Sequence, residues 1–108
     1  MSWDIWLSVE VDGKDVEIVP SVNYTHNTNS MIRAAGFEEW PYRIDGMGCR
    51  EFCKRLDATL EELRSDPTSF RFMNPGNGWG DYDSLVRVLS EVLDAFDSYP
   101  SATVRVSA

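Results

Sequence analysis

The chain has 108 residues, of which 43% are hydrophobic and 26% charged, which fits one folded domain and excludes a disordered chain. Eighteen acidic against ten basic residues give a net charge of -8 at pH 7, which repels nucleic acid and anionic lipid, so we expect neither as a partner. An acidic surface could instead engage a basic protein or imitate DNA, but the charges are scattered, and a solvated acidic surface is the simpler interpretation.

The compartment is predicted from what the sequence does not contain. Its start has no basic region followed by an apolar core, and no apolar run reaches the roughly 20 residues of a membrane helix. We therefore expect a soluble cytoplasmic protein with no membrane partner. Cys49 and Cys53 are four residues apart in a helical pattern, where Cβ atoms lie about 5–6 Å apart rather than the ~3.8 Å of a disulfide, so reduced thiols are expected.

The N-terminal region predicts a β-hairpin. Apolar residues alternate from Trp3 to Val11, which is the period of a half-buried strand, and Asp12-Gly13 predicts the turn. Val16–Val19 continues the alternation until Pro20, which lacks a ladder donor, and residues 21–29 predict a short strand running into a polar loop. Six residues of the first strand have a predicted side: Trp6 partly exposed, and Trp3, Ile5, Leu7, Val9 and Val11 inward.

Two helices are predicted next. Met31–Ala35 predicts a helix of barely two turns that starts at a cap on Asn29 or Ser30 and ends at a left-handed Gly36. From Gly48 to Ser65 the apolar positions recur at threes and fours, which predicts a longer amphipathic helix.

The last third of the chain predicts a further helix and a strand. Asp66-Pro67 stops the preceding helix, and Thr68–Met73 predicts either a short strand or an extended segment. A wide apolar stripe predicts a helix over Ser84–Ser98, and the alternation in Ala102–Val106 predicts a final strand. Three residues are candidates for the cap of the helix: Asp81, Asp83 and Ser84.

The predicted fold class is α+β in a single domain, 1–108. An antiparallel sheet contains Trp3–Val11, Val16–Val19 and Ala102–Val106, and the C-terminal strand pairs with the N-terminal hairpin. The helices near Gly48–Ser65 and Ser84–Ser98 pack on one face of this sheet.

Two polar segments predict a binding site. Asn74–Asp83 contains three glycines, which tolerate unusual backbone angles and close approach, and Asn23–Asn29 contains three asparagines and the only histidine. We expect the two segments to converge into one neutral pocket with an exposed Trp79 as anchor. The alternative, that the asparagines only fix turns, is the simpler interpretation and stays open. Ten residues are candidates for binding: Asn23, Tyr24, Thr25, His26, Asn27, Asn29, Asn74, Asn77, Trp79 and Tyr82.

The sequence predicts no catalytic residue, metal or cofactor. His26 is the only base for neutral pH, but no spacing supports a catalytic triad. Cys49, Cys53 and His26 lack a second paired zinc motif, and Asp81-x-Asp83 is explained by helix capping without magnesium. The glycine-rich loop has no lysine or arginine to hold a phosphate.

Four segments carry a resemblance: Met1–Ile5, Asn23-x-Thr25-x-Asn27, Asn74–Gly78 and Tyr99–Val106. Together they resemble a group of small uncharacterised proteins of actinobacterial phages and some bacteria. The resemblance implies a cytoplasmic accessory protein, in the host cell if phage-encoded, that acts on host or defence functions, and it carries over no catalytic residue. We expect a non-enzymatic protein that binds or inhibits a host or defence protein. The alternative is a binder of a small neutral or nucleotide-like ligand, or an enzyme, that uses the polar pocket with His26.

Overall fold

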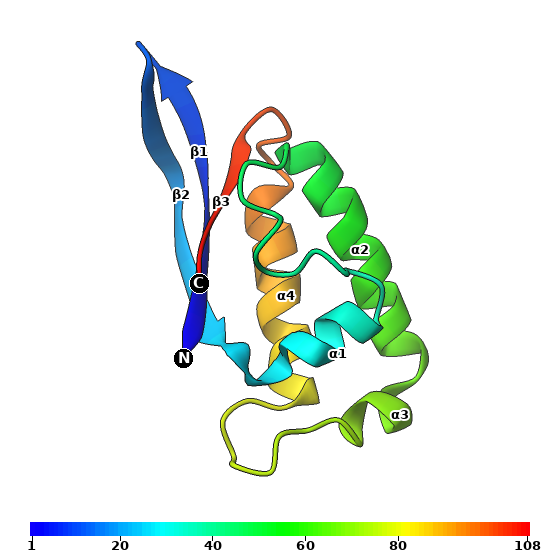
Figure 1. The fold of residues 1–108 in the computed structure, drawn as a ribbon. Coiled ribbons are helices and arrows are strands. Elements are labelled where there is room, and N and C mark those ends of the chain that lie inside the picture. The colour runs from blue at the N-terminus through cyan, green and yellow to red at the C-terminus, as the bar shows by residue number, and fades with distance from the viewer.

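Three strands form one antiparallel sheet in the computed structural model, which describes residues 1–108. Strands β1 (Ser2–Val11), β2 (Lys14–Thr25) and β3 (Thr103–Ser107) lie in the order β2-β1-β3 (Figure 1). The C-terminal strand pairs with the first strand of the hairpin. This confirms the α+β class and the predicted topology.

β2 is longer than the sequence predicted. The expected end at Pro20 is wrong, because the strand continues to Thr25. Two residues of β2, Pro20 and Ser21, lie opposite the single β1 residue Trp6, so the proline sits at a bulge. β2 is also an edge strand, where a proline can be placed without removing a ladder donor.

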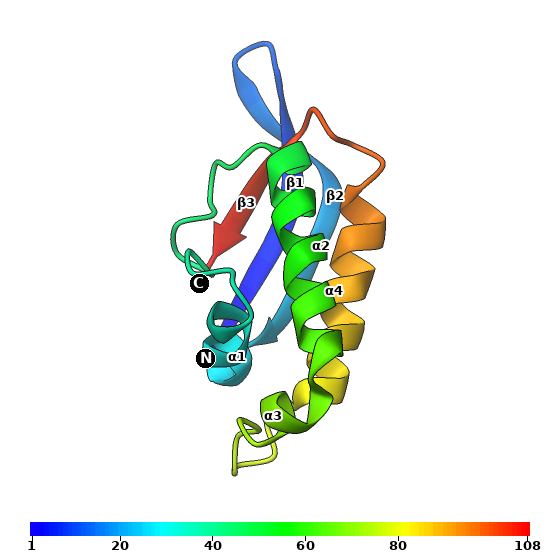
Figure 2. The ribbon, with the colours of Figure 1, turned by 90° about the vertical axis from the view of Figure 1, so that its right-hand side faces the viewer.

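Two long helices, α2 (Cys49–Ser65) and α4 (Tyr82–Phe96), pack side by side over one face of the sheet (Figure 2). Their apolar stripes bury Phe52, Leu56 and Leu89 among others against the sheet. The two predicted main helices are therefore confirmed. No helix in the protein is both long enough and apolar enough to cross a membrane.

The short helix α1 (Asn29–Ala34) follows one turn of 3₁₀ helix, η1 (His26–Thr28). The predicted caps on Asn29 and Ser30 are wrong, since the helix already includes both residues and Thr28 precedes it without a side-chain capping bond. Gly36 has a φ of +111°, as its predicted role at the helix end requires.

Thr68–Met73 is neither a strand nor an extended segment, because Pro67–Arg71 forms helix α3. The Asp66 carboxylate accepts a hydrogen bond from the Ser69 amide at 3.3 Å, and Pro67 occupies the first turn, where its missing N–H is not needed. The pair that stops α2 therefore also starts α3.

The core lies between the sheet and the two long helices. Three of the predicted inward residues of β1 are fully buried: Trp3, Ile5 and Leu7. Trp6 is half-buried, as predicted. Val9 is only half-buried and Val11 is 50% exposed, because the tip of the hairpin projects beyond the ends of the helices (Figure 1). The inward prediction is therefore wrong for Val11.

Candidate functional site

The asparagine-rich and glycine-rich segments meet in space, as predicted. The end of β2 and the loop between α3 and α4 lie at the same end of the molecule, opposite the hairpin tip (Figure 1). The Asn27 amide group donates to the Asn77 side-chain oxygen at 3.4 Å and to the Trp79 carbonyl at 3.3 Å. The Tyr24 and Ser84 hydroxyl groups are hydrogen-bonded at 2.6 Å.

Gly80 makes the closest contact between the two segments. It has a φ of +86°, and a Cβ atom built on it would lie 2.6 Å from the Thr25 methyl carbon and 3.1 Å from the Tyr24 hydroxyl. Both the backbone angle and the space therefore require glycine here. The Thr25 side chain cannot easily rotate away, because its hydroxyl accepts a hydrogen bond from the backbone N–H of Asn27 at 3.2 Å.

The loop has its own internal order. The Asn77 side-chain oxygen accepts a hydrogen bond from the Trp79 backbone amide at 3.0 Å, which is the local turn that asparagine favours. Gly78, between them, has a φ of +76°. The alternative prediction, that asparagines here fix turns, is correct for Asn77. The same residue also lines the cleft described below, so the two roles coexist.

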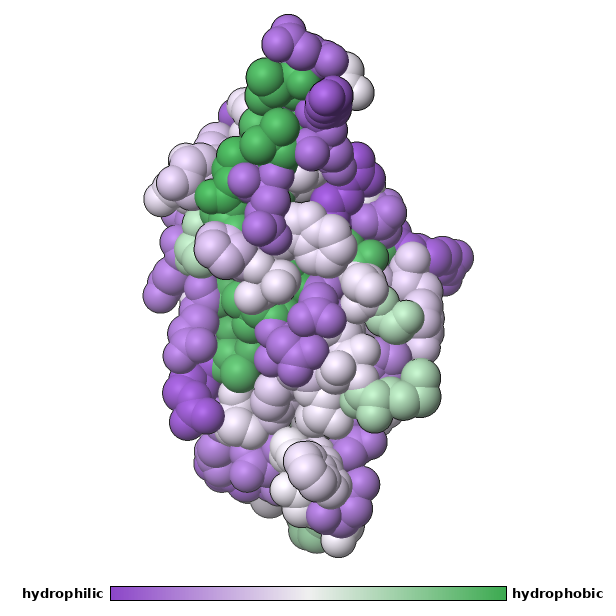
Figure 3. Space-filling view, turned by 90° about the vertical axis from the view of Figure 1, so that its left-hand side faces the viewer, coloured by the Kyte–Doolittle hydropathy of each residue, from purple (hydrophilic) through white to green (hydrophobic).

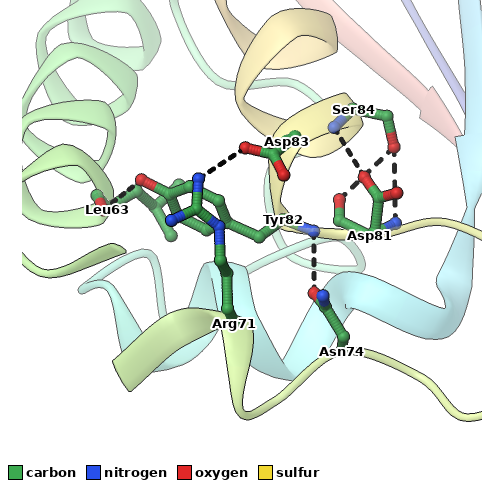
Figure 4. A network of polar contacts seen from close by, with 7 residues as sticks. All are labelled: Leu63, Arg71, Asn74, Asp81, Tyr82, Asp83 and Ser84. Atoms are coloured by element: carbon green, nitrogen blue, oxygen red, sulfur yellow. Dashed lines mark hydrogen bonds and ion pairs between the residues drawn. The ribbon is translucent and has the colours of Figure 1, made fainter. Parts of the chain in front are cut away.

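The start of α4 is fixed by a reciprocal cap (Figure 4). The Asp81 carboxylate accepts the Ser84 amide at 2.7 Å, while the Asp81 amide donates to the Ser84 hydroxyl at 3.3 Å. Of the three candidate caps, Asp81 is the one observed. The hydrogen bond from the Ser84 backbone amide, followed by that from its hydroxyl, holds the pKa of Asp81 below its ordinary value.

Two predicted site residues hold the loop against the helices instead of lining a cleft. The Asn74 side-chain oxygen accepts the Tyr82 amide at 2.8 Å, and the buried Tyr82 hydroxyl donates to the Leu63 carbonyl at 2.7 Å (Figure 4). Arg71 lies over the Tyr82 ring at 5.0 Å and pairs with Asp83 at 2.8 Å. Asn74 and Tyr82 therefore fix the position of the loop relative to α2 and α4 and do not line the cleft.

A cleft of about 650 Å³ opens where the two segments meet the start of β1. Trp79 stands at its wall with 71% of its surface exposed. Six of the predicted residues line the cleft: Asn23, Tyr24, Thr25, Asn27, Asn77 and Trp79. None of the lining side chains is charged, so the site suits hydrogen-bonding neutral groups and an aromatic or apolar contact.

The two remaining predicted residues lie elsewhere. Asn29 is buried, and its side-chain oxygen accepts the indole N–H groups of Trp3 at 3.0 Å and of Trp40 at 3.2 Å. His26 packs edge-on against Tyr42 with ring centres 6.2 Å apart. Its Nε2 is buried without a hydrogen-bond partner, away from the cleft. Asn29 is therefore a core residue.

Three lining residues were missed by the sequence: Met1, Ser2 and Gly80. Ser2 pairs with Thr25 across the hairpin, which brings the start of β1 to the cleft. The Asn23 amide group ties the two strands together by donating to the Ser2 hydroxyl at 3.0 Å and to the Asp4 carboxylate at 3.1 Å. A prediction that the second strand extends to Thr25 would have placed Ser2 beside the cleft. The predicted end of that strand at Pro20 excluded this.

A second cleft, of about 540 Å³, lies between α2 and α4 and carries opposite charges, among them Arg50, Lys54 and Asp94. Its Cys53 thiol lies 3.8 Å from Cys49, and both cysteines are free, as predicted. Burial raises the pKa of Cys53 to about 12 and also raises that of Cys49, so neither is a thiolate at neutral pH. No three His, Cys, Asp or Glu side chains are grouped to share a metal ion.

Comparison with protein families, with curated protein sequences and with solved structures found no match. The interpretation of the cleft therefore rests on its own residues and geometry.

Proposed function

We propose that this protein is a non-enzymatic binding protein that holds a protein partner in the cleft at Trp79. The observation that carries the proposal is the exposure of Trp79 beside a neutral cleft. An indole has a large apolar area to bury and one N–H to donate, and tryptophan is enriched among the residues that dominate protein interfaces. The resemblance suggests a host or defence protein in the cytoplasm as the target, and this identity is part of the proposal.

The rigidity of the cleft supports the proposal. The Asn77 turn, the Gly80 contact and the Asp81 cap fix the loop before any partner arrives. A preformed site loses less conformational entropy on binding than a flexible loop does. The side-chain N–H groups of Asn23 and Asn27 donate within the protein, whereas their side-chain oxygens accept no hydrogen bond there and can accept one from the main chain of a partner.

A small neutral ligand is the second candidate, and the size of the cleft favours it. Its volume of about 650 Å³ falls within the roughly 300–1,000 Å³ of small-molecule sites. Such sites are lined mostly by apolar side chains, whereas only three of the nine residues here are hydrophobic. The protein partner is therefore the better supported of the two, and His26 has no place in either, because it lies outside the cleft.

The test is affinity capture with three forms of the protein: wild type, Trp79→Ala and Phe72→Ala. Phe72 is the matched control, because it is 88% exposed and lies outside the cleft. We expect one stoichiometric partner on the wild type and on Phe72→Ala, and its loss on Trp79→Ala. Equal capture by all three would contradict the proposal. A low-mass compound that co-purifies with the wild type and not with Trp79→Ala in native mass spectrometry would establish the second candidate instead.

A further inference from the structure

The two edges of the sheet differ. The edge of β3 is covered by the segment just before α2: the Gly46 amide donates to the Val104 carbonyl and the Val104 amide to the Met47 carbonyl, each at 2.8 Å, and the Val106 amide donates to the Asp45 carboxylate at 3.0 Å. No hydrogen bond joins the main chain of β2 to any segment other than β1. The outer edge of β2 is therefore the open edge of the sheet.

The geometry of the hairpin identifies which groups are open. Asp12-Gly13 is a two-residue turn with φ of +51° and +78°, and Val11 pairs with Lys14 across it. In such hairpins the flanking pair exchanges both main-chain hydrogen bonds, and every second pair after it does the same. The pairs between them turn their N–H and C=O groups outward. On β2 these are Asp15 and Glu17.

Along this edge of β2, acidic side chains lie on one side of the strand and an apolar side chain lies on the other. Asp15 and Glu17 share one side of the strand, and the 41%-exposed Val16 lies on the other. Figure 3 shows a hydrophobic band that descends from the hairpin tip with hydrophilic residues along its border. Four acidic residues against one lysine give the segment 8–19 a net charge of -3. Only Asp15 among the four is in an ion pair, with Arg105 at 2.7 Å.

We propose that the outer edge of β2 at Asp15 and Glu17 is a second interaction surface, which adds an extended strand of a partner protein in which basic and apolar residues alternate. Main-chain groups of the added strand pair with those of Asp15 and Glu17. Its basic side chains lie on the carboxylate side of the sheet, and its apolar side chains lie beside Val16. The surface is at the opposite end of the molecule from Trp79 and does not depend on the cleft.

A second copy of this chain fits the edge less well. Antiparallel pairing of two β2 strands about Val16 or Glu17 places acidic residues of one copy opposite acidic residues of the other. Like charges directly opposite each other destabilise a strand pair. Arg105 pairs with Asp15 in each copy, but no basic side chain pairs with Glu17, so the repulsion at Glu17 is not offset.

The test is a titration of the whole protein with a synthetic peptide in which lysine alternates with valine, followed by NMR. We expect shifts confined to the hairpin and slower hydrogen exchange at the Asp15 and Glu17 amides. Glu17→Pro removes an outward N–H and should weaken binding about tenfold. Glu17→Gln keeps the N–H, removes the charge, and should weaken binding about threefold.

A modified peptide tested on the wild-type protein gives a control that does not depend on correct folding of the proline variant. The same lysine–valine peptide with an N-methyl group on every residue keeps every charge but has no amide N–H left to donate to a strand, and it should not bind the wild type. Equal binding by the N-methylated peptide, or by a peptide with glutamate in place of lysine, would overturn the proposal. So would a wild-type dimer in sedimentation that Glu17→Pro dissociates, because the edge would then be a self-association surface.

Discussion

Replacement of Gly80 by alanine tests the contact that builds the cleft. The new methyl group would lie 2.6 Å from the Thr25 methyl carbon, and the residue would keep a φ of +86°. Gly78 is the matched control, since it has a φ of +76° in the same loop but no atom within 4 Å of the place that a methyl group would take. Gly78→Ala therefore reports the backbone cost alone, and Gly80→Ala reports the backbone cost plus the clash.

The two costs set the expected magnitudes. An alanine in the left-handed region costs about 1–2 kcal/mol, so Gly78→Ala should lower the free energy of unfolding by that amount. Overpacking a well-filled contact costs about 1–3 kcal/mol more, so Gly80→Ala should lower it by about 2–5 kcal/mol. Relief by rotation of Thr25 would break its hydrogen bond to the Asn27 amide.

The assay is urea unfolding, monitored by circular dichroism, of both single variants and of the double variant that carries Gly80→Ala and Thr25→Ser. The serine keeps the hydroxyl that accepts from Asn27 but removes the methyl group in the way. We expect the double variant to recover about 1 kcal/mol or more relative to Gly80→Ala alone. Equal losses for Gly80→Ala and Gly78→Ala, or no recovery with serine, would refute the close contact.

Three further predictions concern the core and the helix cap. Asn29→Ala leaves the indole N–H groups of Trp3 and Trp40 without their acceptor, so the free energy of unfolding should fall by about 2–4 kcal/mol, and a loss under about 1 kcal/mol in urea would contradict this role. Because the folded pKa of Asp81 is lowered, its carboxylate stabilises the fold above its unfolded pKa of about 3.9 and loses this effect as the pH falls through the lower folded pKa. The stability difference between wild type and Asp81→Asn should therefore shrink over that acidic window in unfolding curves measured against pH, and a difference that grows there would be contrary. Cys53, with its pKa raised to about 12 by burial, should react with a thiol reagent at mildly alkaline pH far more slowly in the native than in the urea-unfolded protein, and rapid native labelling would contradict its burial.

The strands and helices with regular apolar spacing could be predicted from the sequence, because this spacing depends only on residues that are close along the chain. The alternation around Ile5 and the spacing of threes and fours in α2 each report one buried face, and the structure places those faces in one core. The convergence of the two polar segments was also predicted. Each segment combines asparagine with an aromatic neighbour and immediately precedes a helix, which was the basis of the prediction. The contacts of Asn27 confirm it.

Two errors arose where a residue's role depends on distant parts of the fold, and a third arose where one pair of residues has two local roles. Pro20 reads as a strand end, but its place at a bulge in an edge strand removes the penalty. Asn29 was predicted to be a binding residue or a helix cap, but it is a core residue whose partners Trp3 and Trp40 are 26 and 11 residues away. Asp66-Pro67 was interpreted only as a stop, although the same pair caps the next helix.

Binding at Trp79 remains a prediction, and the affinity of the captured partner for three purified proteins tests it most directly. Isothermal titration of the wild type, Trp79→Ala and Phe72→Ala should be accompanied by thermal melting of each protein. We expect Trp79→Ala to lose about 2 kcal/mol or more of binding free energy, or roughly 30-fold in affinity, with a melting temperature close to that of the wild type. Phe72→Ala should bind as the wild type does. An unchanged affinity for Trp79→Ala, with its fold intact, would contradict the assignment of the cleft as the binding site.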